Sequence, residues 1–185
     1  RHLSKAYVRN NKEHKPEGQG AIPNPGKTLA QIFKDAGYAT GAFGKWGLGY
    51  VGSTSDPAAL GFDTFYGYNC QRVAHSFYPP HMWRNDKRET INEKPVRGHW
   101  KGSVKADFDF SQFYGENYAP DLILDEALAF IRQNAKKPFF AYLPFVEPHL
   151  AMHPPHEWVN KYPKEWDQPK ASYKANYLPH LRPRA

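Results

Sequence analysis

The feature that most constrains the fold is an uninterrupted succession of helix, strand and glycine-rich turn within residues 28–49. Thr28 is a good helix N-cap, and Gly37 suits the left-handed position that ends a helix. Between them, apolar residues recur at i, i+3, i+4 and i+7, which predicts one helical face made of Leu29, Ile32, Phe33 and Ala36. Residues 38–43 are small and apolar, as in a strand that is covered on both faces.

Lys45 follows this strand and lies between Gly44 and Gly47, which allow the backbone to bend sharply. In an open α/β sheet, ligands bind beyond the carboxyl ends of the strands. A lysine ammonium beside exposed glycine N–H groups suits a small anion such as sulfate or phosphate. An ordinary surface lysine in a loop is the alternative that spacing alone leaves open.

Two nucleotide-binding motifs are excluded in the same stretch. Residues 47–52 match G-x-G-x-x-G, but residues 53–57 have loop composition where a dinucleotide fingerprint requires a helix. A P-loop ending at the Gly-Lys pair is excluded because Ala39 replaces its first glycine and Trp46 replaces its Ser or Thr.

A second helix–strand unit is predicted in residues 120–149. Pro120 and Asp121 suit the first turn of its helix, and Pro138 prevents continuation. The predicted apolar face contains Leu124, Ala127, Leu128 and Ile131, widened by Ile123 and Phe130. Residues 139–146 are predicted to form a strand buried on both faces, whose ladder ends or bends at Pro144.

The two units place one polar residue each at a strand's carboxyl end. His149 follows the second strand as Lys45 follows the first. If both strands are parallel and belong to one sheet, these two residues lie at the same edge and form a crevice. Between the units, residues 60–68 are predicted to form an aromatic strand or turn at the sheet edge, and Asn85-Asp86 a hairpin turn outside the main sheet.

Composition narrows the class of ligand. The chain has 185 residues, enough for one domain, and a net charge of +7 that is spread along the chain. No nucleic-acid module is recognisable, so the charge favours an anionic, small or polymeric substrate. No apolar run is long enough to span a membrane. Cys70 is the only cysteine and is interpreted as a small buried or loop residue rather than a nucleophile.

Three stretches together resemble the type I sulfatases, the arylsulfatase family. Residues 37–49 are similar to the second signature of the family, with the pattern G-Y-x-T-x-x-x-G-K-W-x-L-G. Residues 61–67 resemble its G-F-D-x-F-x-G phrase, and residues 148–155 its P-H-x-x-x-x-x-P phrase. One departure is Gly47, where many members carry histidine between the Trp and the Leu.

The resemblance implies an alkaline-phosphatase-like α/β fold with a central, mostly parallel sheet, and hydrolysis of a sulfate ester. It implies a formylglycine nucleophile made from Cys or Ser and a calcium ion, with the nucleophile and all metal ligands outside these residues. It assigns Lys45 and His149 to catalysis. The region that follows the aromatic stretch then offers three candidate substrate contacts, Asn69, Gln71 and His75.

Further expectations follow from the same resemblance. The substrate is a sulfated small molecule or polysaccharide, with no nucleic-acid partner and no membrane span, in the periplasm or outside the cell. Residues 1–185 are expected to be an inactive internal piece of one catalytic domain. Core units span about residues 28–45 and 120–149, a loop-rich insertion about 76–118, and a lid-like segment about 150–185.

Other functions stay open at this point. A phosphodiesterase or phosphatase of the same superfamily needs a similar anion site, and a catalytically inactive module could bind a sulfated glycan. A zinc site of His149, His153 and His156 is disfavoured, because Pro154 and Pro155 prevent a continuous helix there. His153 and His156 are instead expected to face solvent.

Overall fold

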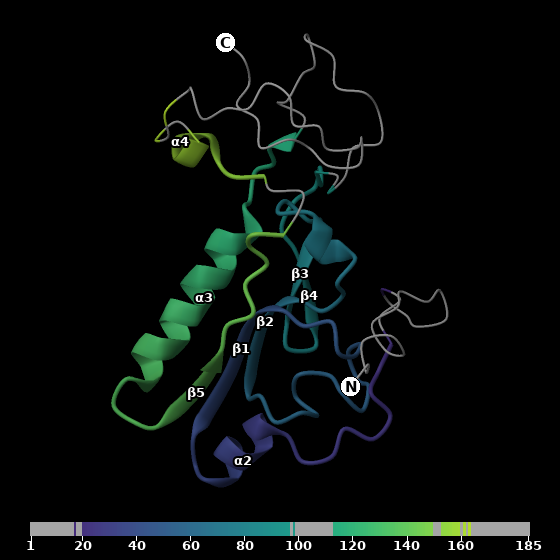
Figure 1. The fold of residues 1–185 in the computed structure, drawn as a ribbon, viewed down its shortest axis with the longest axis vertical. Helices are drawn as coiled ribbons and strands as arrows, with labels where there is room; N and C mark the ends of the chain where they lie inside the picture. The colour runs from purple at the N-terminus through teal and green to yellow at the C-terminus, as the bar shows by residue number, and fades with distance from the viewer. Residues whose placement is uncertain are drawn as a thin grey trace.

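The structure, a computed structural model, describes residues 17, 20–96, 98, 113–149, 153–159, 161 and 163. These residues form one five-stranded sheet with helices on its faces (Figure 1). The strands, in the spatial order β4-β3-β2-β1-β5, are β1 Ala39–Lys45, β2 Thr64–Tyr68, β3 His81–Arg84, β4 Lys87–Thr90 and β5 Phe139–Tyr142. The helices are α2 Leu29–Asp35, the 3-10 helix η1 Val73–His75, α3 Ala119–Asn134 and α4 His156–Val159.

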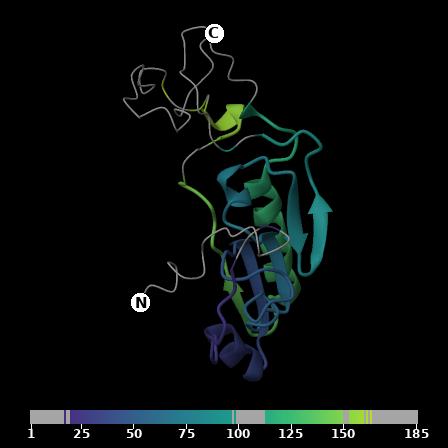
Figure 2. The same cartoon turned by 90° about the vertical axis from the view of Figure 1, so that its right-hand side faces the viewer.

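The three strands β2, β1 and β5 are neighbours in the sheet and parallel. β1 lies between β2 and β5 and is parallel to both, with Lys45 opposite Tyr68 and Ala39 opposite Phe139. This confirms an α/β fold with a mostly parallel sheet, and it confirms that both helix–strand units enter the same sheet. Figures 1 and 2 show α3 running alongside the strands and α2 at the opposite end of the described part from α4.

The predicted hairpin forms with its turn at Asn85-Asp86, but it belongs to the main sheet, whereas it was predicted to lie outside. Its turn is at Asn85, which has a positive φ of 52°. β3 then pairs with β2, with Arg84 opposite Tyr66 and Trp83 opposite Gly67, so the hairpin extends the main sheet. The aromatic stretch before it is therefore an inner strand and not an edge. A single sequence does not show that the strand after β2 returns to pair with it, because such pairing depends on residues far apart along the chain.

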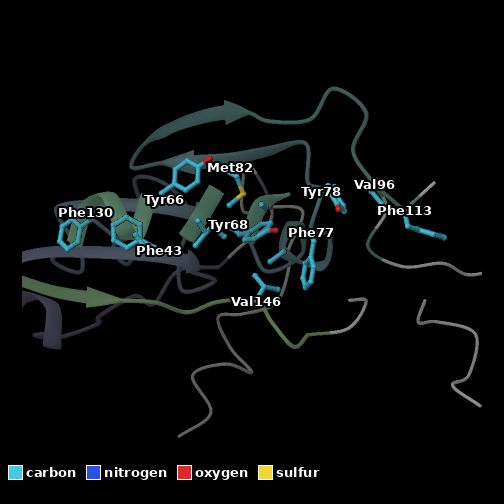
Figure 3. Close-up of a cluster of buried hydrophobic side chains, with 14 residues drawn as sticks. Phe43, Tyr66, Tyr68, Phe77, Tyr78, Met82, Val96, Phe113, Phe130 and Val146 are labelled. Carbon is cyan, nitrogen blue, oxygen red and sulfur yellow. The ribbon is translucent and has the colours of Figure 1, made fainter. Parts of the chain in front are cut away.

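Alternate side chains of the strands enter two separate cores. On the face covered by α3, Phe43, Tyr66 and Met82 pack with Phe130 and other helix residues (Figure 3). On the other face lie Ala42, Phe65 and Trp83, together with Ala30 of α2 and the aromatic side chains Trp46 and Phe62. Successive residues of a strand point to opposite faces, so a sheet with both faces covered needs continuous apolar sequence.

Helix α3 has the predicted position, but its buried face is rotated from the predicted one and includes only part of it. Its buried residues are Ala119, Ile123, Ala127, Phe130 and Asn134. Leu124, which was predicted to be on the apolar face, is exposed. The apolar residues form a stripe broad enough to allow two rotations of the helix, and periodicity does not choose between them. In the structure, the rotation is the one that packs Ile123 and Phe130 against the sheet.

Helix α2 shows the same kind of correction. Thr28 caps it in a capping box with Gln31, as the cap prediction required, and Gly37 has the expected positive φ of 83°. However, the buried residue is Ala30, whereas Leu29 and Ile32 are 59% and 50% exposed in the part of the chain that the structure describes. The predicted face of this helix was therefore wrong.

β1 and β5 differ in burial although both were predicted to be covered on both faces. Five consecutive residues of β1, 40–44, are buried, which confirms the prediction for that strand. β5 is half-buried and its last residue, Tyr142, is exposed, because β5 lies at an edge of the sheet among the described residues. The ladder ends before Pro144, as predicted.

A buried hydroxyl ties the start of β1 to the turn before β2. Thr40 is fully buried, and its Oγ1 lies 2.7 Å from the carbonyl oxygen of Gly61 and 2.9 Å from Oδ2 of Asp63. Burial by itself would raise the pKa of Asp63, but hydrogen bonds from Lys34 and Thr40 outweigh it and lower this pKa. The stabilisation from the carboxylate is therefore present above its unfolded-state pKa and is lost as pH falls through the lower, folded-state value.

We expect Thr40→Val to lower the free energy of unfolding by about 1–3 kcal/mol, because valine keeps the shape but leaves buried acceptors without their donor. Urea denaturation of the full-length protein measures the change. Thr40→Ser is the matched control, since it keeps the hydroxyl and should cost less. Equal stability of Thr40→Val and the wild type would contradict this role of the hydroxyl.

Candidate active site

Lys45 is the last residue of β1, and it lies where three strands end together. Its backbone N–H donates to the carbonyl oxygen of Pro144, beyond β5, at 2.8 Å. The next residue, Trp46, donates to the carbonyl oxygen of Tyr68 at the end of β2, at 2.9 Å. The carboxyl ends of β1, β2 and β5 therefore meet at one edge of the sheet, which is the usual ligand edge of an α/β fold.

Glycine at position 44 allows this close approach. Gly44 has a positive φ of 135°, and a Cβ there would overlap the carbonyl group of Pro144. On the other side, a Cβ on Gly67 of β2 would overlap the carbonyl oxygen of Gly44. The backbone just before Lys45 is thus closely packed from two sides, which holds the start of its side chain in place.

His149 reaches the same edge from the segment that follows β5. Its backbone N–H donates to the carbonyl oxygen of Val146 at 2.9 Å, which forms a turn. Its ring stacks on that of His75, with ring centroids 5.1 Å apart and planes at 29°. His75 ends η1, which follows β2, so the structure brings together two of the predicted site residues that are 74 positions apart in the chain.

Asn69 and Gln71 continue from the end of β2 past the glycine turn. The carbonyl oxygen of Asn69 accepts from the N–H of Gly47 at 3.0 Å. The Asn69 side chain is 1% exposed, and neither its amide nitrogen nor its oxygen has a hydrogen-bond partner among the described residues. A buried carboxamide of this kind is expected to bind an ordered water or a ligand group. The half-buried side chain of Gln71 packs directly against Gly47.

Burial is the main influence on the pKa of the Lys45 ammonium. Partial burial lowers the pKa of Lys45, and nearby Cys70 opposes this shift. Burial raises the pKa of the Cys70 thiol, and that thiol donates to the carbonyl oxygen of Glu17 at 3.2 Å. A buried thiol of raised pKa is a poor nucleophile, which agrees with the interpretation of Cys70 from sequence. The partly desolvated ammonium of Lys45 interacts more strongly with an anion than an exposed lysine does.

One supporting cluster near this edge was missed by sequence reasoning. The buried carboxylate of Glu17 contacts the Nε2 of His81 and accepts from the Nε1 of Trp83 at 3.2 Å. Arg88 lies 3.0 Å from the other ring nitrogen of His81. Because Glu17 also accepts from Cys70, the cluster connects the β3–β4 hairpin to the loop that carries Asn69 and Gln71. No local pattern links residues so distant in sequence.

Metal ligands are not grouped in the part of the chain that the structure describes. No three His, Cys, Asp or Glu side chains there are placed to hold a metal ion, so these residues do not fit a calcium or zinc centre. His153 was expected to face solvent, but it is 4% exposed and stacks on Phe113, with Phe77 edge-on to it. The side chain of His156 lies outside the described residues, as do most of residues 1–19 and 160–185.

The side chains at this edge are suited to oxyanion chemistry. A lysine ammonium stabilises negative charge, and an imidazole exchanges a proton with an ester oxygen. A family model described as Sulfatase matches residues 3–182 of this chain.

Two similar curated proteins are named as sulfatases. The arylsulfatase of Hemicentrotus pulcherrimus is 32% identical over 138 residues, which cover 74% of this chain and 24% of the relative. The N-acetylgalactosamine-6-sulfatase of Sus scrofa is 34% identical over 128 residues, which cover 66% of this chain and 22% of the relative. The chain thus spans about a quarter of the length of these curated relatives.

Solved structures support the fold. Ps i-CgsB in complex with k-i-k-neocarrahexaose aligns with a TM-score of 0.56 and 21% identity, over 77% of this chain and 31% of that one. A protein solved in work on the metabolism of multiple glycosaminoglycans by Bacteroides thetaiotaomicron aligns with a TM-score of 0.53, also at 21% identity, over 76% of this chain and 38% of that one. With a family model that matches nearly all of its residues, the chain belongs to the sulfatase family.

Proposed function

We propose that this chain forms part of the catalytic domain of a sulfuric ester hydrolase and that the sulfate ester binds between Lys45 and His149. One observation carries the proposal: Lys45 is the last residue of β1, and His149 lies in the segment that follows β5, the parallel strand beside β1. That edge is where α/β folds bind ligands. A cation suits an ester that is anionic before cleavage, and an imidazole suits the alkoxide that leaves when the ester is cleaved.

Each predicted side chain has a proposed task. The ammonium of Lys45 binds a sulfate oxygen. In its protonated form, the imidazole of His149 donates a proton to the bridging oxygen as the sulfur–oxygen bond breaks. His75 and Gln71 contact the substrate from the loop after β2. The buried carboxamide of Asn69, which has no hydrogen-bond partner among the described residues, is the third proposed contact.

Calcium and the formylglycine nucleophile are proposed to come from parts of the protein outside this chain. The family generally uses both, but the residues described here offer no grouped metal ligands. The tasks assigned above therefore belong only to side chains of this chain. In this proposal the separate chain, without nucleophile and metal ligands, is inactive.

The proposed substrate is a carbohydrate sulfate. The names of two similar proteins support this class: one is an N-acetylgalactosamine-6-sulfatase and another was solved with a neocarrahexaose. The net charge of +7 favours an anionic polymer over a neutral one. Among the described residues no helix is both long and apolar enough to cross a bilayer. Action in the periplasm or outside the cell is part of the proposal.

Assays of the full-length protein with para-nitrophenyl sulfate and para-nitrophenyl phosphate test the function, because the two esters share one leaving group. We expect turnover of the sulfate ester and much slower turnover of the phosphate ester. A preference for phosphate would favour a phosphatase or phosphodiesterase. Binding of a sulfated oligosaccharide with no turnover of any ester would favour an inactive glycan-binding module.

A further inference from the structure

The Gln71 side chain lies where a side chain of residue 47 would begin, at the carboxyl edge of the sheet. Gly47 has a positive φ of 75°, and a Cβ on it would lie 2.6 Å from Cγ and 2.8 Å from Nε2 of Gln71. Real Cβ atoms essentially never approach other atoms that closely. The Gln71 side chain therefore occupies the place that a side chain of residue 47 would fill.

Backbone pairing holds Gln71 in this place. Trp46 donates to the carbonyl oxygen of Tyr68, and Gly47 donates to that of Asn69, so the two chains stay paired beyond the ends of β1 and β2. Val73 then donates to the carbonyl oxygen of Cys70 at 3.2 Å, which turns the chain into η1 around Gln71. The backbone position of Gln71 thus follows from the same ladder that positions Lys45.

Gln71 also lies close to the proposed anion site. Cys70, the residue before it, contributes to the electrostatic environment of Lys45. Gly47, on which the Gln71 amide packs, is two residues beyond Lys45. A carboxamide has N–H donors for an anion and a carbonyl acceptor for a hydroxyl, and it does not titrate at any pH at which the protein is folded.

We propose that Gln71 is a substrate-binding residue whose amide N–H donates to a sulfate oxygen beside Lys45, in the volume that glycine at position 47 leaves open. This inference rests on the proposed function for the identity of the ester. It adds that residues 47 and 71 are coupled, because a side chain at position 47 would require the Gln71 side chain to move from its present place.

The test compares Gln71→Ala with Gln71→Glu in the full-length protein. Both turnover of para-nitrophenyl sulfate and binding of inorganic sulfate by calorimetry are measured. Loss of one hydrogen bond to an anion predicts a kcat/KM about 10- to 100-fold lower for Gln71→Ala. Gln71→Glu keeps the shape that packs on Gly47 but repels the anion, so we expect at least as large a loss.

The variant Gly47→Ala provides a second test of the same inference. Its methyl group displaces the Gln71 side chain, so we expect a loss like that of Gln71→Ala, and the double variant should be no worse than Gln71→Ala alone. Thermal unfolding of each variant separates this effect from the strain of alanine at positive φ. Because an amide does not titrate, Gln71→Ala should leave the pH profile of kcat/KM unchanged in shape.

The outcomes distinguish this inference from the proposed function. If the wild type is active and Gln71→Ala has the same turnover and the same sulfate binding as the wild type, the inference is overturned and the proposed function stands. Full activity of Gln71→Glu would show that Gln71 only packs, and would also overturn it. No turnover by the wild type, with sulfate binding that Gln71→Ala weakens, would overturn the function and support the inference.

Discussion

Replacing Lys45 with alanine is expected to lower kcat/KM for sulfate esters by about 100- to 1,000-fold in the full-length protein, the cost of removing one preorganised charge from a developing anion. The effect is large because partial burial keeps bulk water from replacing the lost ammonium. Steady-state kinetics with para-nitrophenyl sulfate measure it. Lys34, which pairs with Asp63 on the exposed surface of α2, is the control, and Lys34→Ala should retain activity.

The pH dependence of sulfate affinity independently tests whether Lys45 binds the anion. Burial places the pKa of Lys45 below that of an ordinary lysine, so its proton is lost at a lower pH. Only the protonated form attracts the anion. Sulfate affinity should therefore fall as pH rises through this lowered pKa. Lys45→Arg keeps its charge to higher pH and should move the decline upward. An alkaline decline at the same pH in both proteins would contradict the assignment to Lys45.

The second large effect is expected for His149→Ala. Loss of a general acid costs about 100- to 10,000-fold, and the cost depends on how much the leaving oxygen needs a proton. A carbohydrate alkoxide needs it far more than para-nitrophenolate does. We therefore expect a severe loss with a carbohydrate sulfate and a much smaller one with para-nitrophenyl sulfate. Equal losses with both substrates would show that His149 binds the ester rather than protonating it.

His75 provides the matched control for this experiment. Its ring stacks on the ring of His149, so His75→Phe keeps a ring in the stack but removes the nitrogen atoms. If His75 contacts the substrate, His75→Phe should raise KM for both substrates without the leaving-group dependence seen for His149→Ala. A leaving-group dependence like that of His149→Ala would assign the proton to His75 instead.

Local signals predicted where most elements occur. The capping box at Thr28, the left-handed Gly37, the hairpin turn at Asn85 and the end of the ladder before Pro144 are all present. Each depends on a few neighbouring residues, because a cap, a turn or a missing N–H acts within one or two turns of backbone. Motif spacing likewise indicated Lys45, which ends β1, and His149, which lies after β5.

The rotation of the helices was not predictable in this way. Leu124 and Leu29 are as apolar as the residues that are buried, but both are exposed in the part of the chain that the structure describes. A helix with a broad apolar stripe has several acceptable orientations, and the surface it packs against selects one. The buried position of His153 between Phe77 and Phe113 has the same origin, since nothing in its sequence neighbours predicts a ring stack.

The sequence by itself determined the order of helix, strand and glycine turn, the family, and the identity of the lysine and histidine at the strand ends, because these depend on short-range chemistry and spacing. Only the tertiary structure decided what surrounds them. It placed His75 against His149, extended the sheet with the β3–β4 hairpin, and put Gln71 into the volume left by Gly47. The physical reason is that these contacts arise when distant backbone segments pair at one sheet edge, and their geometry follows from packing rather than from neighbours in the chain.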